Sequence, residues 1–122
     1  MTHPHLLSPL TLRGQTLRNR IVFGAHTANM SENGLPGAQY RAYLLERALG
    51  GAAMIVTEPA PVHPTGVLTR GNFRCQDDAI IPGFRKITES VRDAGAVIFA
   101  KTNTPEFGAG ANTRNRVFGI RT

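Results

Sequence analysis

Four polar residues with chemically useful side chains follow two apolar segments of the chain. His26 and Thr27 come directly after the first segment, and Glu58 and His63 follow the second. Enzymes built on parallel strands place catalytic groups at the strand ends, so Glu58 could act as a catalytic carboxylate. The alternative is a structural carboxylate tied to a neighbouring arginine or a loop amide. His26 and His63 could converge, but no third residue has metal-ligand spacing, and no metal site is expected.

Cys75 and a glycine-rich segment are weaker candidates for chemistry. Cys75 has His63 upstream but no carboxylate placed to orient it, which favours a buried or exposed thiol over a nucleophile. Gly108-Ala109-Gly110 lacks the third glycine and the strand–helix context of a nucleotide-binding loop. No catalytic residue is assigned from these patterns. His26 and Thr27 stay open between a ligand role and ordinary loop polarity.

The elements that must position these residues alternate between strands and helices. Short apolar runs next to glycine predict strands buried on both faces, and apolar residues spaced by three and four predict helices. The predicted order is a strand within 17–24, a helix over 39–49, a strand over 52–57, a helix over 80–94 and a strand over 96–100. The inner helix faces are predicted to carry Tyr40, Tyr43, Leu44, Ala48, Phe84, Ile87 and Val91.

The predicted connections are asymmetric. Both loops after strands (25–37 and 58–78) are long, whereas both turns after helices are short and rich in glycine. Barrel enzymes build their sites on the loops after strands, so the predicted class is α/β, the truncated opening of a (β/α)8 TIM barrel, rather than a doubly wound sheet. The strands are expected to be parallel in βαβαβ order. Residues 1–8 are expected to form a loose arm, residues 9–15 an extended pair, and the polar residues after Ala100 an irregular tail.

The composition is that of a globular chain and excludes several functional classes. Hydrophobic residues make up 41% of the 122 residues, without a run of about 18 apolar residues, so no membrane span is expected. The net charge of +6 comes from scattered basic residues without a zinc or RNA-binding motif, so no nucleic-acid partner is expected. The single cysteine excludes an intrachain disulfide and favours a reducing, cytoplasmic location.

Residues 7–100 resemble the N-terminal part of the Old Yellow Enzyme family of flavin-dependent NAD(P)H oxidoreductases. The likeness is carried by Leu7-Ser8-Pro9-Leu10 with Leu17-Arg18-Asn19-Arg20-Ile21-Val22, by 46–51, by 55–66 and by 77–100. The pair Ala25-His26 is most similar to the trimethylamine dehydrogenase and dienoyl-CoA reductase branch of that family.

This resemblance implies a barrel that holds FMN, takes electrons from NAD(P)H and acts on a small-molecule substrate. In such enzymes the end of the first strand contacts the flavin ring, and Ala25, His26 and Thr27 hold that position here. The end of the second strand lies near the reactive edge of the flavin, and Pro59, which has no N–H to donate, holds that position. The implied cofactor-binding residues are these four.

Residues 101–122 resemble a segment of the amidase signature enzymes, through Lys101-Thr102-Asn103-Thr104-Pro105-Glu106-Phe107-Gly108. The chain is therefore divided into a partial flavin oxidoreductase domain at 1–100 and an amidase-like tail at 101–122. Amidases of this type use a Ser-cisSer-Lys triad, and the tail contains no serine. The flavin family's remaining catalytic and phosphate-binding parts lie beyond the third strand, so a fragment without activity of its own is expected.

Three other functions stay open. One is an amidase-type hydrolase fragment, and another is a non-catalytic interaction module that pairs an open sheet edge with a partner. The third is a basic nucleic-acid binder, whose signature would be strongly salt-dependent binding. Three strands of an eight-stranded barrel leave two edges unpaired, so self-association through these edges is also expected.

Overall fold

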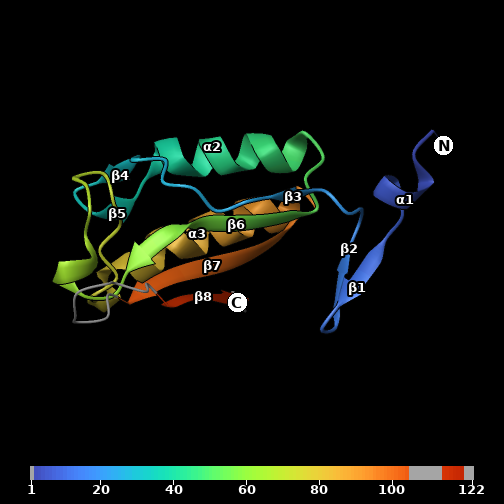
Figure 1. The fold of residues 1–122 in the computed structure, drawn as a ribbon. Helices are drawn as coiled ribbons and strands as arrows, with labels where there is room; N and C mark the ends of the chain where they lie inside the picture. Colours follow the sequence, from blue (N-terminus) through green and yellow to red (C-terminus); the bar gives the residue numbers. More distant parts are fainter. Residues whose placement is uncertain (1, 105–113, 120–122) are drawn as a thin grey trace.

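A small, mainly parallel sheet with two helices on one face forms the body of the protein (Figure 1). The computed structural model describes residues 2–104 and 114–119. The sheet order is β3-β6-β7-β8, formed by β3 (Val22–Phe23), β6 (Met54–Pro61), β7 (Val97–Thr104) and β8 (Arg114–Gly119). β3, β6 and β7 are parallel, and they are connected by α2 (Ala38–Leu49) and α3 (Ile81–Asp93). The predicted βαβαβ order is confirmed.

The core lies between the sheet and the two helices. Tyr40, Leu44 and Ala48 of α2 are buried together with Ile87 and Val91 of α3, as the helical spacing predicts. The strands contribute Ile55 and Ile98 to the same cluster. The predicted inner-face residues Tyr43 and Phe84 are only partly buried and pack against its margin. Since both helices share one core, the opposite face of the sheet carries no helix among the described residues.

The first strand is shorter and more exposed than predicted. β3 spans only Val22–Phe23, and Ile21 and Val22 are 37% and 46% exposed, where burial on both faces was expected. β3 lies at the sheet edge, with β6 as its one neighbour among the described strands. Its outer side chains therefore have no strand or helix to cover them.

The second and third strands are longer than predicted. β6 continues to Pro61 rather than ending at residue 57, and β7 continues to Thr104 rather than ending at Ala100. The polar side chains at 101–104 suggested irregular structure, but β7 pairs with β6 as far as Asn103 and with β8 on its other side. Tertiary pairing overrides local propensity here. The remainder of the predicted tail, 105–113 and 120–122, lies outside the described residues.

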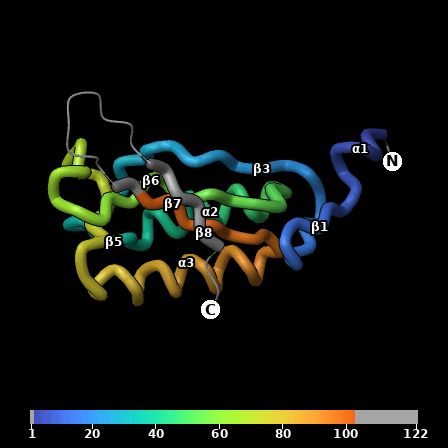
Figure 2. The backbone as a smooth tube through the Cα atoms, turned by 60° about the horizontal axis from the view of Figure 1, so that its bottom comes forward, coloured from blue at the N-terminus to red at the C-terminus, as the bar shows by residue number. Residues whose placement is uncertain are grey.

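An N-terminal unit lies at the amino ends of the parallel strands, and the long loops lie at the opposite end (Figures 1 and 2). A one-turn helix, α1 (Pro4–Leu7), replaces part of the predicted loose arm, because its carbonyl groups close a local turn. β1 (Leu10–Leu12) and β2 (Gln15–Leu17) form the predicted extended pair, which turns at Arg13-Gly14 with positive φ at both residues. The loop after β3 contains a second small hairpin, β4 (Ser31–Glu32) and β5 (Leu35–Pro36).

Candidate functional site

A β-bulge lies in β6 close to its carboxyl end. Val56 pairs with Phe99, and the next paired residues are Pro59 and Lys101, so Thr57 and Glu58 together oppose one residue of β7. Bulges re-aim side chains and recur beside active sites. Thr57 and Glu58 are both fully buried, at 0% and 1% exposure. The bulge therefore places a carboxylate inside the protein rather than on a loop after the strand.

Side chains satisfy the backbone groups that the bulge displaces. The Glu58 N–H donates to the Tyr40 hydroxyl of α2 over 2.9 Å. The Lys101 N–H donates to Thr57 Oγ1 over 3.1 Å, and that hydroxyl donates to the Glu58 carbonyl over 3.2 Å. Because buried amides without partners are costly, these three bonds fix the bulge as a rigid feature of the sheet.

The Glu58 carboxylate bonds to the loop that follows β3. The Ala28 N–H donates to Glu58 Oε2 over 2.6 Å, and Oε1 is buried without a partner among the described residues. Burial raises the pKa of the Glu58 carboxyl, and the amides of Ala28 and Asn29 oppose that shift. Of the two predicted roles, the contacts confirm the structural one, a carboxylate tied to a loop amide.

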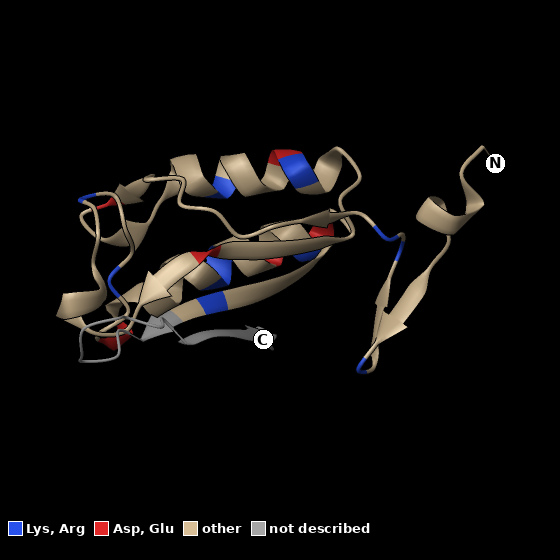
Figure 3. Cartoon of the chain, in the orientation of Figure 1, with Lys and Arg blue, Asp and Glu red and all other residues tan. Residues whose placement is uncertain are grey.

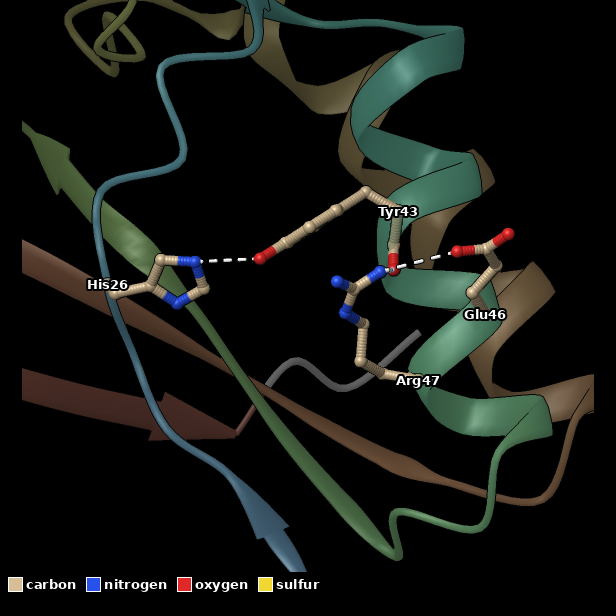
Figure 4. Close-up of polar contacts among 4 residues, drawn as sticks. All are labelled: His26, Tyr43, Glu46 and Arg47. Carbon is tan, nitrogen blue, oxygen red and sulfur yellow. Dashed lines mark hydrogen bonds and ion pairs between the residues drawn. The ribbon is translucent and has the colours of Figure 1, made fainter.

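The predicted cofactor-binding residue His26 faces α2 (Figure 4). Its Nε2 lies 2.8 Å from the Tyr43 hydroxyl, and its ring lies edge-on to Phe23, with 5.3 Å between the centroids. Arg47 covers the Tyr43 ring at 3.6 Å from the centroid and donates to the Tyr43 carbonyl over 2.9 Å. The imidazole of His26 thus belongs to an aromatic and cationic cluster between β3 and α2.

Pro59 lies beside Lys101 on the sheet face without helices. The two are paired in register and half-buried, and alternation along β7 gives Lys101 the same face as Phe99. In Figure 3 the one acidic residue of β6 is a red band and the one basic residue of β7 is a blue band. Sequence reasoning missed Lys101 because it counted this residue in the tail. The period-two spacing of Val97, Phe99 and Lys101 was the available signal.

Ala25 and Thr27 complete the predicted set, in the loop directly after β3. Ala25 is half-buried and Thr27 is exposed. The structure brings these residues to the carboxyl end of β3, next to the longer β6 that carries Pro59. The four predicted residues therefore lie at one end of two adjacent parallel strands, with His26 turned toward the helix layer.

The two long loops are joined to each other at this end of the sheet. The Ser31 N–H donates to the Gly71 carbonyl over 3.3 Å, and the Arg74 N–H donates to the Gly34 carbonyl over 2.9 Å. A Cβ atom at Gly71 would lie 2.6 Å from Asn29 Cα, so this approach requires glycine. The loop after β3 and the loop after β6 are thus hydrogen-bonded to each other at the carboxyl ends of the strands.

Other residues considered for chemistry have structural partners. Nδ1 of His63 lies 2.8 Å from Thr65 Oγ1, whereas Nε2 of His26 contacts the Tyr43 hydroxyl. Burial raises the pKa of the Cys75 thiol to about 11, which keeps it protonated and unreactive at neutral pH. Within the described residues, no three His, Cys, Asp or Glu side chains are grouped to hold a metal, and no helix is long and apolar enough to cross a membrane.

The segment Leu17–Val22, which carried much of the family resemblance, is structural. Arg18 donates to the carbonyls of Ala48, Ala52 and Ala94, at the ends of both helices. Asn19 donates to the Gly51 carbonyl over 2.8 Å and accepts from the Ile21 N–H over 2.9 Å. These contacts lie at the amino ends of the strands, opposite the candidate site.

Comparison with known proteins supports the flavin resemblance. Residues 5–111 match the model of the NADH:flavin oxidoreductase / NADH oxidase family. The chain is 41% identical over 99 residues to a probable N-methylproline demethylase of Rhizobium meliloti, covering 80% of this chain and 15% of that protein. It is 33% identical over 95 residues to an NADPH dehydrogenase of Bacillus subtilis, covering 76% of this chain and 28% of that protein.

Solved structures share the same fold over most of the chain. An old yellow enzyme homologue from Zymomonas mobilis matches with a TM-score of 0.74 and 27% identity, over 81% of this chain and 28% of its own. Morphinone reductase in complex with tetrahydroNAD matches with a TM-score of 0.74 and 26% identity, over 81% of this chain and 27% of its own. The chain spans less than a third of the length of these relatives. Because the family match extends over most of its residues, the chain belongs to the NADH:flavin oxidoreductase / NADH oxidase family.

Proposed function

We propose that this chain provides the first part of an FMN site in an NAD(P)H-dependent oxidoreductase acting on a small-molecule substrate. The observation that carries the proposal is the placement of Ala25–Thr27 and Pro59 at the carboxyl ends of adjacent parallel strands in a chain of this family. Bound FMN would supply hydride transfer, and the protein would position it.

The residues present fit the ring of a flavin better than its phosphate. Pro59 and Phe99 offer an apolar surface on the face without helices, and Lys101 is paired in register with Pro59. Ala25 and Thr27 add small side chains at the neighbouring strand end. Barrels bind phosphate through the loops after the seventh and eighth strands. We therefore propose that the ring is contacted by this chain and the phosphate by sequence corresponding to the rest of the relatives.

Titration with FMN and with riboflavin, followed by flavin fluorescence and absorbance, tests this function. Similar saturable affinities for the two ligands are expected, because riboflavin carries the same ring without the phosphate. Absence of saturable binding to soluble protein would refute the proposal. NADH or NADPH oxidation by the isolated chain is expected to stay at the level of free FMN, since the chain spans less than a third of its relatives.

A second candidate is an interaction module that uses the free edge of β3. Ile21 and Val22 are 37% and 46% exposed there, and the outer edge of β3 has no strand neighbour among the described elements. Pairing with a second copy or another strand would cover both side chains. Light scattering of the unaltered chain and of Val22→Lys tests this, with loss of the larger species expected in the variant.

We propose that residues 101–122 share ancestry with an amidase segment, with the domain boundary at residue 100. The family match extends to residue 111 and so overlaps the start of this segment. No amidase activity is proposed for it, because a serine nucleophile is required and 101–122 contain none. Detectable amide hydrolysis by the purified chain would contradict this.

A further inference from the structure

Glu58 is a buried carboxylate whose bonding is unusual for a purely stabilising residue. Its side chain is 1% exposed, yet only Oε2 has a hydrogen-bond partner among the described residues. Removing a carboxylate from water is costly unless both oxygens are bonded. An apolar side chain of the same length would avoid that cost. We therefore expect the Glu58 carboxylate to have a role that depends on its hydrogen bond through Oε2.

That group is the backbone of the loop after β3. The Ala28 N–H donates to Glu58 Oε2 over 2.6 Å, across 30 positions of the chain. Ala28 follows Ala25–Thr27 directly, and the next residue, Asn29, has a φ of 56°. The backbone therefore enters the left-handed region directly after the residue that the carboxylate holds.

The base of the Glu58 side chain is itself held in place. Its backbone lies in the bulge, where its N–H donates to the Tyr40 hydroxyl of α2 over 2.9 Å. Tyr40 is fully buried and packs edge-on to Phe73, with 4.8 Å between the ring centroids. Because β6 and α2 fix the backbone of Glu58, the hydrogen bond from its carboxylate fixes the loop after β3 relative to both elements.

We propose that Glu58 is a positioning residue for the flavin-contact segment Ala25–Thr27, acting through its hydrogen bond to the Ala28 amide. Glu58 does not touch the cofactor in this proposal. The inference rests on the proposed function for its link to FMN, whereas its effect on the loop can be measured without any ligand.

The test uses the full chain labelled with ¹⁵N and compares three variants. Glu58→Met keeps the length of the side chain and removes the acceptor, and Glu58→Gln keeps an acceptor oxygen. Glu46→Met is the matched control, because the Glu46 side chain is 79% exposed and makes one weak ion pair. Amide hydrogen exchange at residues 25–29 and in α3 is measured first, and the FMN dissociation constant second.

Glu58→Met is expected to speed exchange of the Ala28 amide by about tenfold, the size of one lost hydrogen bond, and to leave the α3 amides unchanged. FMN affinity should weaken by a similar factor, and Glu58→Gln and Glu46→Met should match the unaltered chain in both measurements. Unchanged exchange at Ala28, or equal acceleration in the loop and α3, would overturn the proposal. Faster loop exchange with unchanged FMN affinity would overturn its link to the cofactor. If the unaltered chain binds no FMN, the proposed function fails, and the exchange data alone decide whether Glu58 holds the loop.

Discussion

Replacing Tyr40 by phenylalanine tests whether the bulge in β6 is a rigid part of the fold. The Tyr40 hydroxyl accepts the Glu58 N–H over 2.9 Å, and the ring is 1% exposed. Phenylalanine preserves the ring contact with Phe73 and removes only the acceptor. A buried amide without a partner costs about 1–3 kcal/mol, which is a large fraction of the stability of a small domain.

Tyr43→Phe is the matched control on the same helix. The Tyr43 hydroxyl bonds to His26, an exposed residue, so water can replace this contact and the expected cost is about 0.5 kcal/mol or less. Burial raises the pKa of the Tyr40 hydroxyl, so it stays protonated throughout the usual pH range and does not complicate the comparison.

Urea unfolding followed by circular dichroism measures both variants. With a slope of roughly 2 kcal/mol per molar urea, Tyr40→Phe should lower the midpoint by about 0.5–1.5 M, and Tyr43→Phe by about 0.25 M or less. Equal midpoints for the two variants would refute the reasoning, since the bond from Glu58 would then contribute no more than a solvated contact.

Three further predictions concern stability, titration and reactivity. Asn19→Ala should lower the free energy of unfolding by about 1–3 kcal/mol in a thermal melt, because the Gly51 carbonyl and the Ile21 amide lose their partner. A loss of less than about 0.5 kcal/mol, the size typical of a surface substitution, would contradict this. Since burial raises the pKa of Glu58 above its ordinary 4.5, the folded state binds the proton more tightly, and stability should fall as pH rises from 4.5 through the folded-state pKa. Glu58→Gln should reduce this fall in urea titrations at several pH values, and an unchanged slope would argue against it. With its pKa raised to about 11 from 9.0, Cys75 should react with iodoacetamide at pH 8 roughly 100-fold more slowly in the folded chain than in urea, and equal rates would count against its burial.

The sequence by itself determined the elements whose signals are local. The spacing of Tyr40, Leu44 and Ala48 predicted the buried face of α2. Apolar residues at helical spacing lie on one side of a helix, and that side is the one turned away from water. Gly14 indicated the turn because glycine readily adopts a positive φ, and Arg13 adopts one beside it. The sequence motif around Asn19 also indicated the family. In the structure, the Asn19 side chain donates to the Gly51 carbonyl in the turn after α2.

Only the tertiary structure decided the surroundings of Glu58, Lys101 and His26. The prolines and the acidic residue at 58–61 have low strand propensity, yet pairing with β7 continues the strand and forces the bulge that buries Glu58. The bond from Ala28 to Glu58 joins residues 30 positions apart, and no local pattern predicts such a pair. The register between β6 and β7 pairs Lys101 with Pro59 on the sheet face without helices. The contact with the Tyr43 hydroxyl orients the His26 side chain. Each of these placements depends on which strand or helix packs next to the residue. Such long-range packing cannot be read from local residue types and their spacing.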